Sequence, residues 1–199
     1  GQMSVGSTNP SSRRVFRETE MFLLVLLGYL WFTAELFLGE TQYFRDLTFY
    51  SLPFRKLLVD FAVSGHIPLW NPLHHGGQAF ITSVSTSTLT PLNALFFILE
   101  PIRALNLMLA TCVASCCGGA YVLARQLGFS KMPSVVCSLV FSFSGVALSQ
   151  VNLLNQLLAL AHLPWLMTFW HLWLRESRGR DVVLTVITAV SQFVSGSPE

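Results

Sequence analysis

Long apolar segments alternate with short basic turns along most of the chain. A helix that crosses a bilayer needs about 20 mostly apolar residues. Most of these segments approach that length and carry almost no charge. The pattern predicts an all-α membrane protein, a polytopic transmembrane helix bundle, with spans at 21–38, 104–123, 133–151, 153–174 and 182–196.

A long loop, 39–103, separates the first two predicted spans and holds two shorter apolar segments. In the segment 49–61, apolar side chains recur at helical spacing, while Arg55, Lys56 and Asp60 lie elsewhere on the wheel. This pattern predicts an amphipathic helix in the membrane interface, and a helix packed on neighbouring protein would show the same pattern. The segment 91–99 is too short to span and is expected to be interfacial or re-entrant.

Basic residues mark one side of the predicted membrane. Cytoplasmic loops are enriched in Lys and Arg, which sets the orientation of such proteins. The polar N-terminal tail, 1–20, and both short turns between later spans are basic. We therefore expect a cytoplasmic N-terminus, a location in the cell membrane and an extracytoplasmic loop 39–103. The residues that decide this are Arg13, Arg14, Arg17, Arg125, Lys131, Arg175, Arg178 and Arg180.

Composition supports a membrane protein and excludes some partners. Of 199 residues, 52% are hydrophobic and 11% are charged, whereas soluble domains carry about a quarter charged residues. A net charge of +2 gives no reason to expect nucleic acid as a partner. All four cysteines lie in apolar segments without metal-ligand spacing, so we expect small core residues rather than disulfides: Cys112, Cys116, Cys117 and Cys137.

Two features predict how the later spans pack. Small residues one turn apart, Ala114 with Gly118 and Ser115 with Gly119, let helix backbones approach closely in lipid. Pro164 is expected to kink the fourth span. A histidine in the same span, His162, is either a satisfied core residue or part of a polar cavity.

The most unusual stretch is 65–77, which reads GHIPLWNPLHHGG. Its prolines favour extended neighbours, and Gly76 and Gly77 permit positive φ or close backbone approach. Between them lie groups that can stack and hydrogen-bond, namely Trp70, Asn71, His74 and His75. A ligand-binding loop is one interpretation, and a structured loop without a ligand is the other. Adjacent histidines in an extended segment point to opposite sides, which disfavours one shared metal.

Asp46 is the candidate catalytic carboxylate. It follows the first predicted span closely, and Arg45, Arg55 and Lys56 are near it in sequence. Cations could bind the oxygens of a lipid-linked phosphate, while the carboxylate acts as a base or holds a divalent metal. A solvated loop with ordinary interfacial cations is the alternative.

At these residues the chain resembles the bacterial YfhO-type membrane proteins. The resemblance rests on GHIPLWNPLHHGG, TPLNALFFIL, ARQLGFSK, FSFSG and GSPE. The chain departs from the family pattern at Thr90, Gln78 and Ala79. The resemblance implies a glycosyltransferase of the multi-span GT-C class, with Asp46 at the position of the catalytic acid. Binding of donor or acceptor is then expected at Arg45, Arg55, Lys56, Trp70, Asn71, His74, His75, Gly76 and Gly77.

We therefore expect transfer of a sugar from a polyprenyl-phosphate donor to a glycan or lipid acceptor of the cell envelope. A transporter or flippase of lipid-linked sugars is one rival, and a non-catalytic glycan-binding scaffold is another. The chain starts with Gly and stops directly after an apolar run, so we expect a fragment that is inactive without further helices.

Overall fold

The fold comes from a computed structural model, which describes residues 27–29, 34, 46–72, 76–80 and 87–195. Of the described residues, 77% are helical. The N-terminal tail, 1–20, and nearly all of the first predicted span, 21–38, lie outside the described residues. The elements in chain order are η1 (Leu47–Ser51), α2 (Leu52–Val63), β1 (Trp70–Asn71), β2 (Gln78–Ala79), η3 (Pro91–Phe97), α3 (Pro101–Gln126), α4 (Lys131–Ser142), α5 (Gly145–Gln150), α6 (Leu154–Glu176) and α7 (Gly179–Val194).

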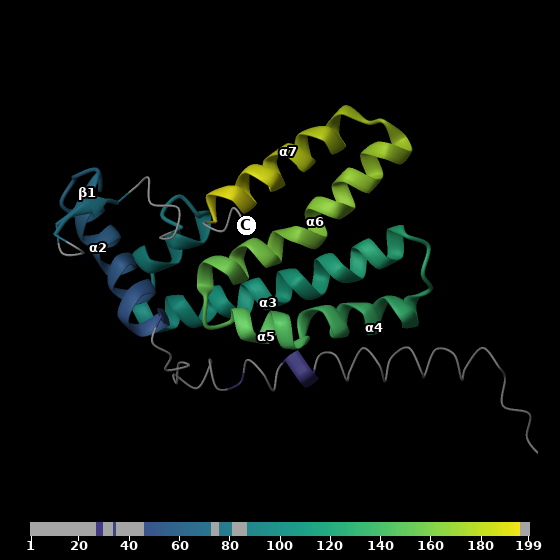
Figure 1. The fold of residues 1–199 in the computed structure, drawn as a ribbon, viewed down its shortest axis with the longest axis horizontal. Helices are drawn as coiled ribbons and strands as arrows, with labels where there is room; N and C mark the ends of the chain where they lie inside the picture. Colours follow the sequence, from purple (N-terminus) through teal and green to yellow (C-terminus); the bar gives the residue numbers. More distant parts are fainter. Residues whose placement is uncertain (1–26, 30–33, 35–45, 73–75, 81–86, 196–199) are drawn as a thin grey trace, which may run out of the picture.

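The longest helix, α3, organises the bundle (Figure 1). It packs against α4 on one side and α6 on the other, and α7 folds back along α6. The elements from η1 to η3 gather at the end where α3 begins, and the α3–α4 and α6–α7 turns lie at the opposite end. The long loop and the basic turns are thus at opposite ends of the bundle.

Two helices, α3 and α6, are long and apolar enough to cross a membrane. They correspond to the predicted spans 104–123 and 153–174, each extended by a few residues. The predicted span 182–196 corresponds to α7, which has 16 residues. The short helix η3, of 7 residues, is too short to span, as expected for the segment 91–99.

The predicted span 133–151 is divided into two helices, which a continuous apolar pattern does not predict. The segment forms α4, of 12 residues, and α5, of 6 residues, with a break at Phe143 and Ser144. Ser144 caps α5, because its Oγ accepts a hydrogen bond of 3.2 Å from the amide of Ala147. A serine with extended backbone followed by glycine favours the start of a new helix over continuation of the old one. At about 1.5 Å per residue, α4 alone covers about 18 Å, which is shorter than a bilayer core of about 30 Å, so α5 would have to continue the path of a span here.

Small residues let α3 and α6 approach closely, as the sequence predicts. Ser115 Oγ donates to the carbonyl of Ala161 at 3.2 Å, and the indole of Trp165 donates to Ser115 Oγ at 3.0 Å. A Cβ on Gly119 would lie 2.9 Å from Pro164 Cγ and 2.9 Å from Trp165 Nε1. Position 119 therefore has to be glycine for α3 and α6 to pack this closely.

We expect Gly119→Ala to destabilise the bundle, because neither Pro164 nor the hydrogen-bonded Trp165 can move aside. Overpacking of this kind costs about 1–3 kcal/mol. Gly118→Ala is the matched control, since its Cβ would meet Trp165 Cζ2 at an ordinary 3.6 Å. Thermal unfolding in detergent measures both. Equal melting temperatures for the two variants would contradict the proposed close approach.

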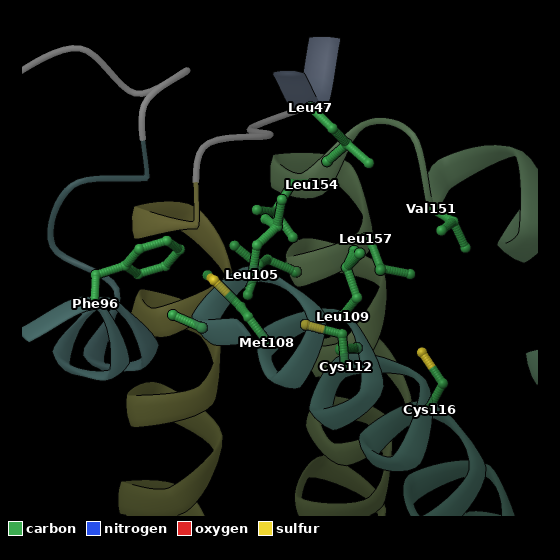
Figure 2. Close-up of a cluster of buried hydrophobic side chains, with 13 residues drawn as sticks. Leu47, Phe96, Leu105, Met108, Leu109, Cys112, Cys116, Val151, Leu154 and Leu157 are labelled. Carbon is green, nitrogen blue, oxygen red and sulfur yellow. The ribbon is translucent and has the colours of Figure 1, made fainter. Parts of the chain in front are cut away.

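The core joins the loop elements to the bundle (Figure 2). Leu47 of η1 and Phe96 of η3 are buried in one cluster with side chains of α3 and α6. Figure 2 shows Phe96 pointing from η3 toward Leu105 and Met108 of α3. Because these contacts fix η1 and η3 against α3, residues next to them are held in defined positions.

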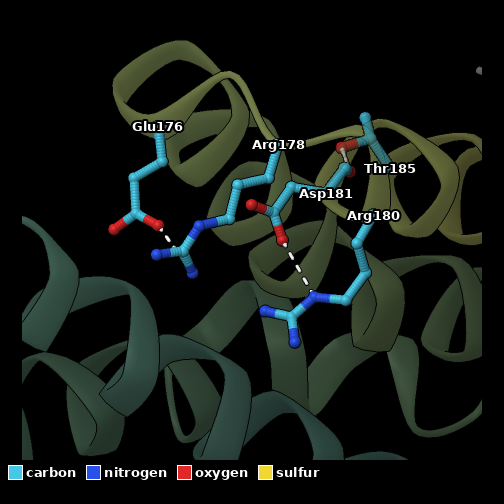
Figure 3. A network of polar contacts seen from close by, with 5 residues as sticks. All are labelled: Glu176, Arg178, Arg180, Asp181 and Thr185. Atoms are coloured by element: carbon cyan, nitrogen blue, oxygen red, sulfur yellow. Dashed lines mark hydrogen bonds and ion pairs between the residues drawn. The ribbon is translucent and has the colours of Figure 1, made fainter.

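The basic turns carry their own polar contacts (Figure 3). Glu176 and Arg178 form an ion pair of 2.9 Å at the α6–α7 turn. Asp181 is buried in the first turn of α7, where the helix dipole favours a carboxylate, and Arg180 Nε lies 3.5 Å from its Oδ1. Arg175 reaches the carbonyl of Gln126 at 3.4 Å, which links the two turns.

Candidate functional site

The helix α2 places Arg55 differently from the sequence prediction. The spacing puts Arg55 with Lys56 and Asp60 on the polar face, but only Lys56 and Asp60 are exposed. Arg55 is 3% exposed. The long loop folds back on the bundle, so η3 covers a side of α2 that the wheel assigns to solvent.

Within the described residues, the buried Arg55 meets no carboxylate. Its Nη1 donates to the carbonyl of Ser51 at 3.1 Å, and its guanidinium carbon lies 5.7 Å from the centre of the Phe96 ring. Its Nε is buried without a hydrogen-bond partner in this part of the chain. Buried charges in proteins are normally paired. Arg55 is therefore a buried cation that departs from this rule within the described part of the chain.

Burial lowers the pKa of Arg55 from its ordinary value to about 10, and the neighbouring Cys112 thiol opposes this shift. The guanidinium therefore remains charged at neutral pH. Between about pH 10 and the higher pKa that arginine has in the unfolded chain, Arg55 is protonated in the unfolded chain and deprotonated in the folded chain. The free energy of unfolding is accordingly expected to rise as the pH rises through this interval, because the cost of the buried charge disappears.

Asp46 lies at the N-terminal boundary of η1, half-buried, and its side chain does not cap that helix. The π-helical turn that follows is a rare geometry that recurs at functional sites. Arg55 comes nine residues later in the same helical run, about 13 Å along the axis at the α-helical rise. The structure thus places both predicted residues on one element without bringing them into contact.

The stretch 65–77 contains β1, which pairs antiparallel with β2 in a two-stranded hairpin, an addition to the all-α prediction. Trp70 pairs with Ala79 and Asn71 with Gln78. Gly76 and Gly77 have φ of +76° and +115°, so the predicted need for glycine is confirmed at both positions. The indole of Trp70 packs on Gly77, where a Cβ would lie 2.6 Å from Cζ2.

Trp70 and Asn71, two residues of β1 predicted to bind a ligand, differ in their exposure to solvent. Trp70 is 57% exposed, whereas Asn71 is buried. The strand end is anchored by Phe80, which is buried and stacks on Phe54 at 5.5 Å between ring centres. Trp70 can therefore contact a ligand from solvent, and Asn71 supports the hairpin from inside.

Three predicted site residues, Arg45, His74 and His75, lie outside the described residues. Among the residues that are described, no group of three or more potential ligands could hold a metal ion. His162 is a satisfied core histidine, since its Nδ1 lies 2.7 Å from the carbonyl of Leu158. All four cysteines are free; Cys112 and Cys116 are buried as expected of core residues, Cys117 is half-buried, and the expectation of a core residue is wrong for Cys137, which is exposed.

Comparisons with family models, with curated proteins and with solved structures found no match to this chain. Function therefore has to be inferred from the site.

Sequence reasoning missed a buried polar cluster beside η3, formed by Ser87, Thr90 and Asn93. Asn93 Nδ2 donates to the carbonyls of Ser87 and Thr88 at 2.8 and 2.9 Å. The hydroxyl of Ser87 donates to the carbonyl of Ser195 at the end of α7. The available signal was a polar residue within the apolar run 91–99, directly after a tract of Ser and Thr.

Proposed function

We propose that this chain is the membrane module of a glycosyltransferase that uses a polyprenyl-phosphate sugar and acts on a cell-envelope acceptor outside the cytoplasm. The observation that carries the proposal is Arg55, a buried cation without a carboxylate partner among the described residues. The likeness of the loop motifs to YfhO-type proteins agrees with it.

Arg55 would bind the phosphate of the lipid donor. A guanidinium offers several N–H donors to phosphate oxygens, and an arginine in a water-poor site binds an anion more strongly than one in solvent. The leaving group of the reaction is the lipid phosphate, so negative charge grows on its oxygens as the bond to the sugar breaks. Arg55 would stabilise that charge in the transition state.

Asp46 would act as the general base. It removes the proton from the acceptor hydroxyl while that oxygen attacks the anomeric carbon, and the bond from this carbon to the phosphate oxygen breaks. The proton passes to the carboxylate, and the electron pair leaves with the lipid phosphate. The separation of Asp46 from Arg55 suits these two different tasks.

The surface of the bundle supports a location in the membrane. The outer side of α7 exposes apolar side chains at helical spacing, namely Val183, Val186, Ile187, Val190 and Phe193. Contiguous exposed apolar surface is typical of lipid contact or of further protein contact. With α3 and α6 as spans, the basic turns would face the cytoplasm and the hairpin would lie outside it.

A labelling experiment tests this orientation. We expect a cysteine at position 74, introduced as His74→Cys in a background without native cysteines, to react with an impermeant thiol reagent in intact cells. A cysteine replacing Lys131, the first residue of α4, is the control and should react only after lysis. The reverse pattern would place the long loop in the cytoplasm and exclude the proposed acceptor.

Transfer in proteoliposomes tests the function. The full-length protein, loaded with a radiolabelled polyprenyl-phosphate sugar, should move label to an envelope acceptor. A flippase would instead expose the labelled donor at the other leaflet without consuming it. A scaffold would do neither.

A further inference from the structure

Two buried polar atoms at the start of η3 have no partner in the described part of the chain. They are the hydroxyl oxygen of Thr90 and the amide oxygen of Asn93. Thr90 is 5% exposed and Asn93 is 4% exposed. An unsatisfied buried polar group costs about 1–3 kcal/mol, so two of them three residues apart require an explanation.

The neighbourhood fixes how these groups are oriented. Asn93 uses its Nδ2 for two backbone carbonyls, so its Oδ1 faces away from them as an acceptor. Thr90 occupies the N-terminal boundary of η3, where a hydroxyl commonly caps the helix, yet it makes no capping bond. The hydroxyl of Thr90 is therefore available to a ligand as donor or acceptor.

The helix η3 connects this pair to Arg55. Side chains three residues apart lie on the same face of a 3₁₀ helix, and Asn93 and Phe96 are the two buried side chains of η3. The guanidinium of Arg55 lies over the ring of Phe96. At about 2.0 Å per residue, Asn93 is roughly 6 Å along the helix from Phe96. Thr90 and Asn93 thus lie at the start of η3, and Arg55 of α2 lies over Phe96 further along the same short helix.

We propose that Thr90 and Asn93 form a sugar subsite, which binds ring hydroxyls of a glycosyl phosphate whose phosphate lies on Arg55. The ligand class follows from the groups present: a cation for the phosphate, an amide oxygen that accepts from a hydroxyl, and a hydroxyl that can donate or accept. This inference rests on the proposed function for the role of Arg55, and it adds the part of the site that binds the sugar.

The contact of Ser87 with Ser195 holds the subsite in place. It joins the loop before η3 to the end of α7, over 108 residues of sequence. Figure 1 shows the C-terminal end of α7 returning to this loop. The backbone around Thr90 is therefore fixed by the bundle, as expected for a site that must hold a ring in one orientation.

Thr90→Val is the sharpest test, because it keeps the shape of the side chain and removes a hydroxyl that has no partner among the described residues. The probes are inorganic phosphate and the 1-phosphates of glucose, galactose, mannose and N-acetylglucosamine, titrated against the full chain in detergent. At least one sugar phosphate should bind more tightly than inorganic phosphate. Thr90→Val should weaken that binding about threefold to tenfold and leave inorganic phosphate unchanged.

Thr111→Val is the matched control, since its exposed hydroxyl bonds the carbonyl of Leu107 far from η3. It should change neither affinity. If phosphate binds through Arg55 but no sugar phosphate binds more tightly, the subsite is refuted and the phosphate site stands. If Thr90→Val weakens both probes equally, the subsite is also refuted. If no probe binds at all, both the subsite and the proposed phosphate site fail.

Discussion

Asp46→Asn in the full-length protein should abolish sugar transfer while expression and membrane insertion stay normal. The substitution preserves the shape of the side chain and removes the group that accepts the proton. General-base catalysis contributes about 10²–10⁴-fold to such reactions, and a loss of that size is expected in the turnover rate. Binding of the lipid donor should survive, because Asp46 is not among the contacts of Arg55.

Asp60→Asn is the control for this prediction. Asp60 lies on the same helical run as Asp46 and is exposed near the end of α2. Transfer should continue at the wild-type rate in this variant. Normal turnover in Asp46→Asn together with loss in Asp60→Asn would show that the catalytic carboxylate is misassigned. If neither variant changes turnover, the proposal of an enzyme loses its chemical basis.

Arg55→Met should separate stability from binding. Removing an unpaired buried charge in favour of an apolar side chain of similar length is often neutral or stabilising, by about 1–4 kcal/mol. The melting temperature without ligand should therefore be unchanged or higher. Wild-type protein should gain about 2.7 kcal/mol of stability at a phosphate concentration a hundred times Kd, and the variant should gain none. Transfer should fall by about 10²–10³-fold.

Lys56→Met provides the matched control, because Lys56 is adjacent in sequence and exposed. It removes the same charge from the same helix and should leave phosphate stabilisation intact. An arginine that only stabilises the fold would give a different melting temperature and a different response to phosphate from one that binds the phosphate. If Arg55→Met lowers the melting temperature by many degrees and phosphate stabilises both proteins equally, Arg55 is a structural residue.

Much of the bundle could be predicted from the sequence, since apolar length and small-residue spacing act locally along a helix. The α3–α6 seam follows from Ser115 and Gly119, and the glycines of the hairpin turn follow from the need for positive φ. The break between α4 and α5 was harder to foresee. The segment carries no charge, its serines are spread along its length, and only Ser144 followed by Gly145 signals a second helix start.

The position of Arg55 could not be predicted from a helical wheel. A wheel assigns residues to faces, but which face is covered depends on where the chain returns, and here η3 covers the side that carries Arg55. The same return of the chain creates the cluster of Thr90 and Asn93. Its link to Ser195 joins residues 108 positions apart, a separation beyond the reach of local patterns.

Direct binding of a polyprenyl monophosphate to the protein in lipid nanodiscs is the most direct test of the account. Wild-type protein should bind the radiolabelled lipid saturably, inorganic phosphate should compete, and the corresponding polyprenol without phosphate should not bind. Arg55→Met should lose this binding, and Lys56→Met should keep it. Equal binding of the polyprenol, or undiminished binding by Arg55→Met, would contradict the claim that the buried arginine is the phosphate site.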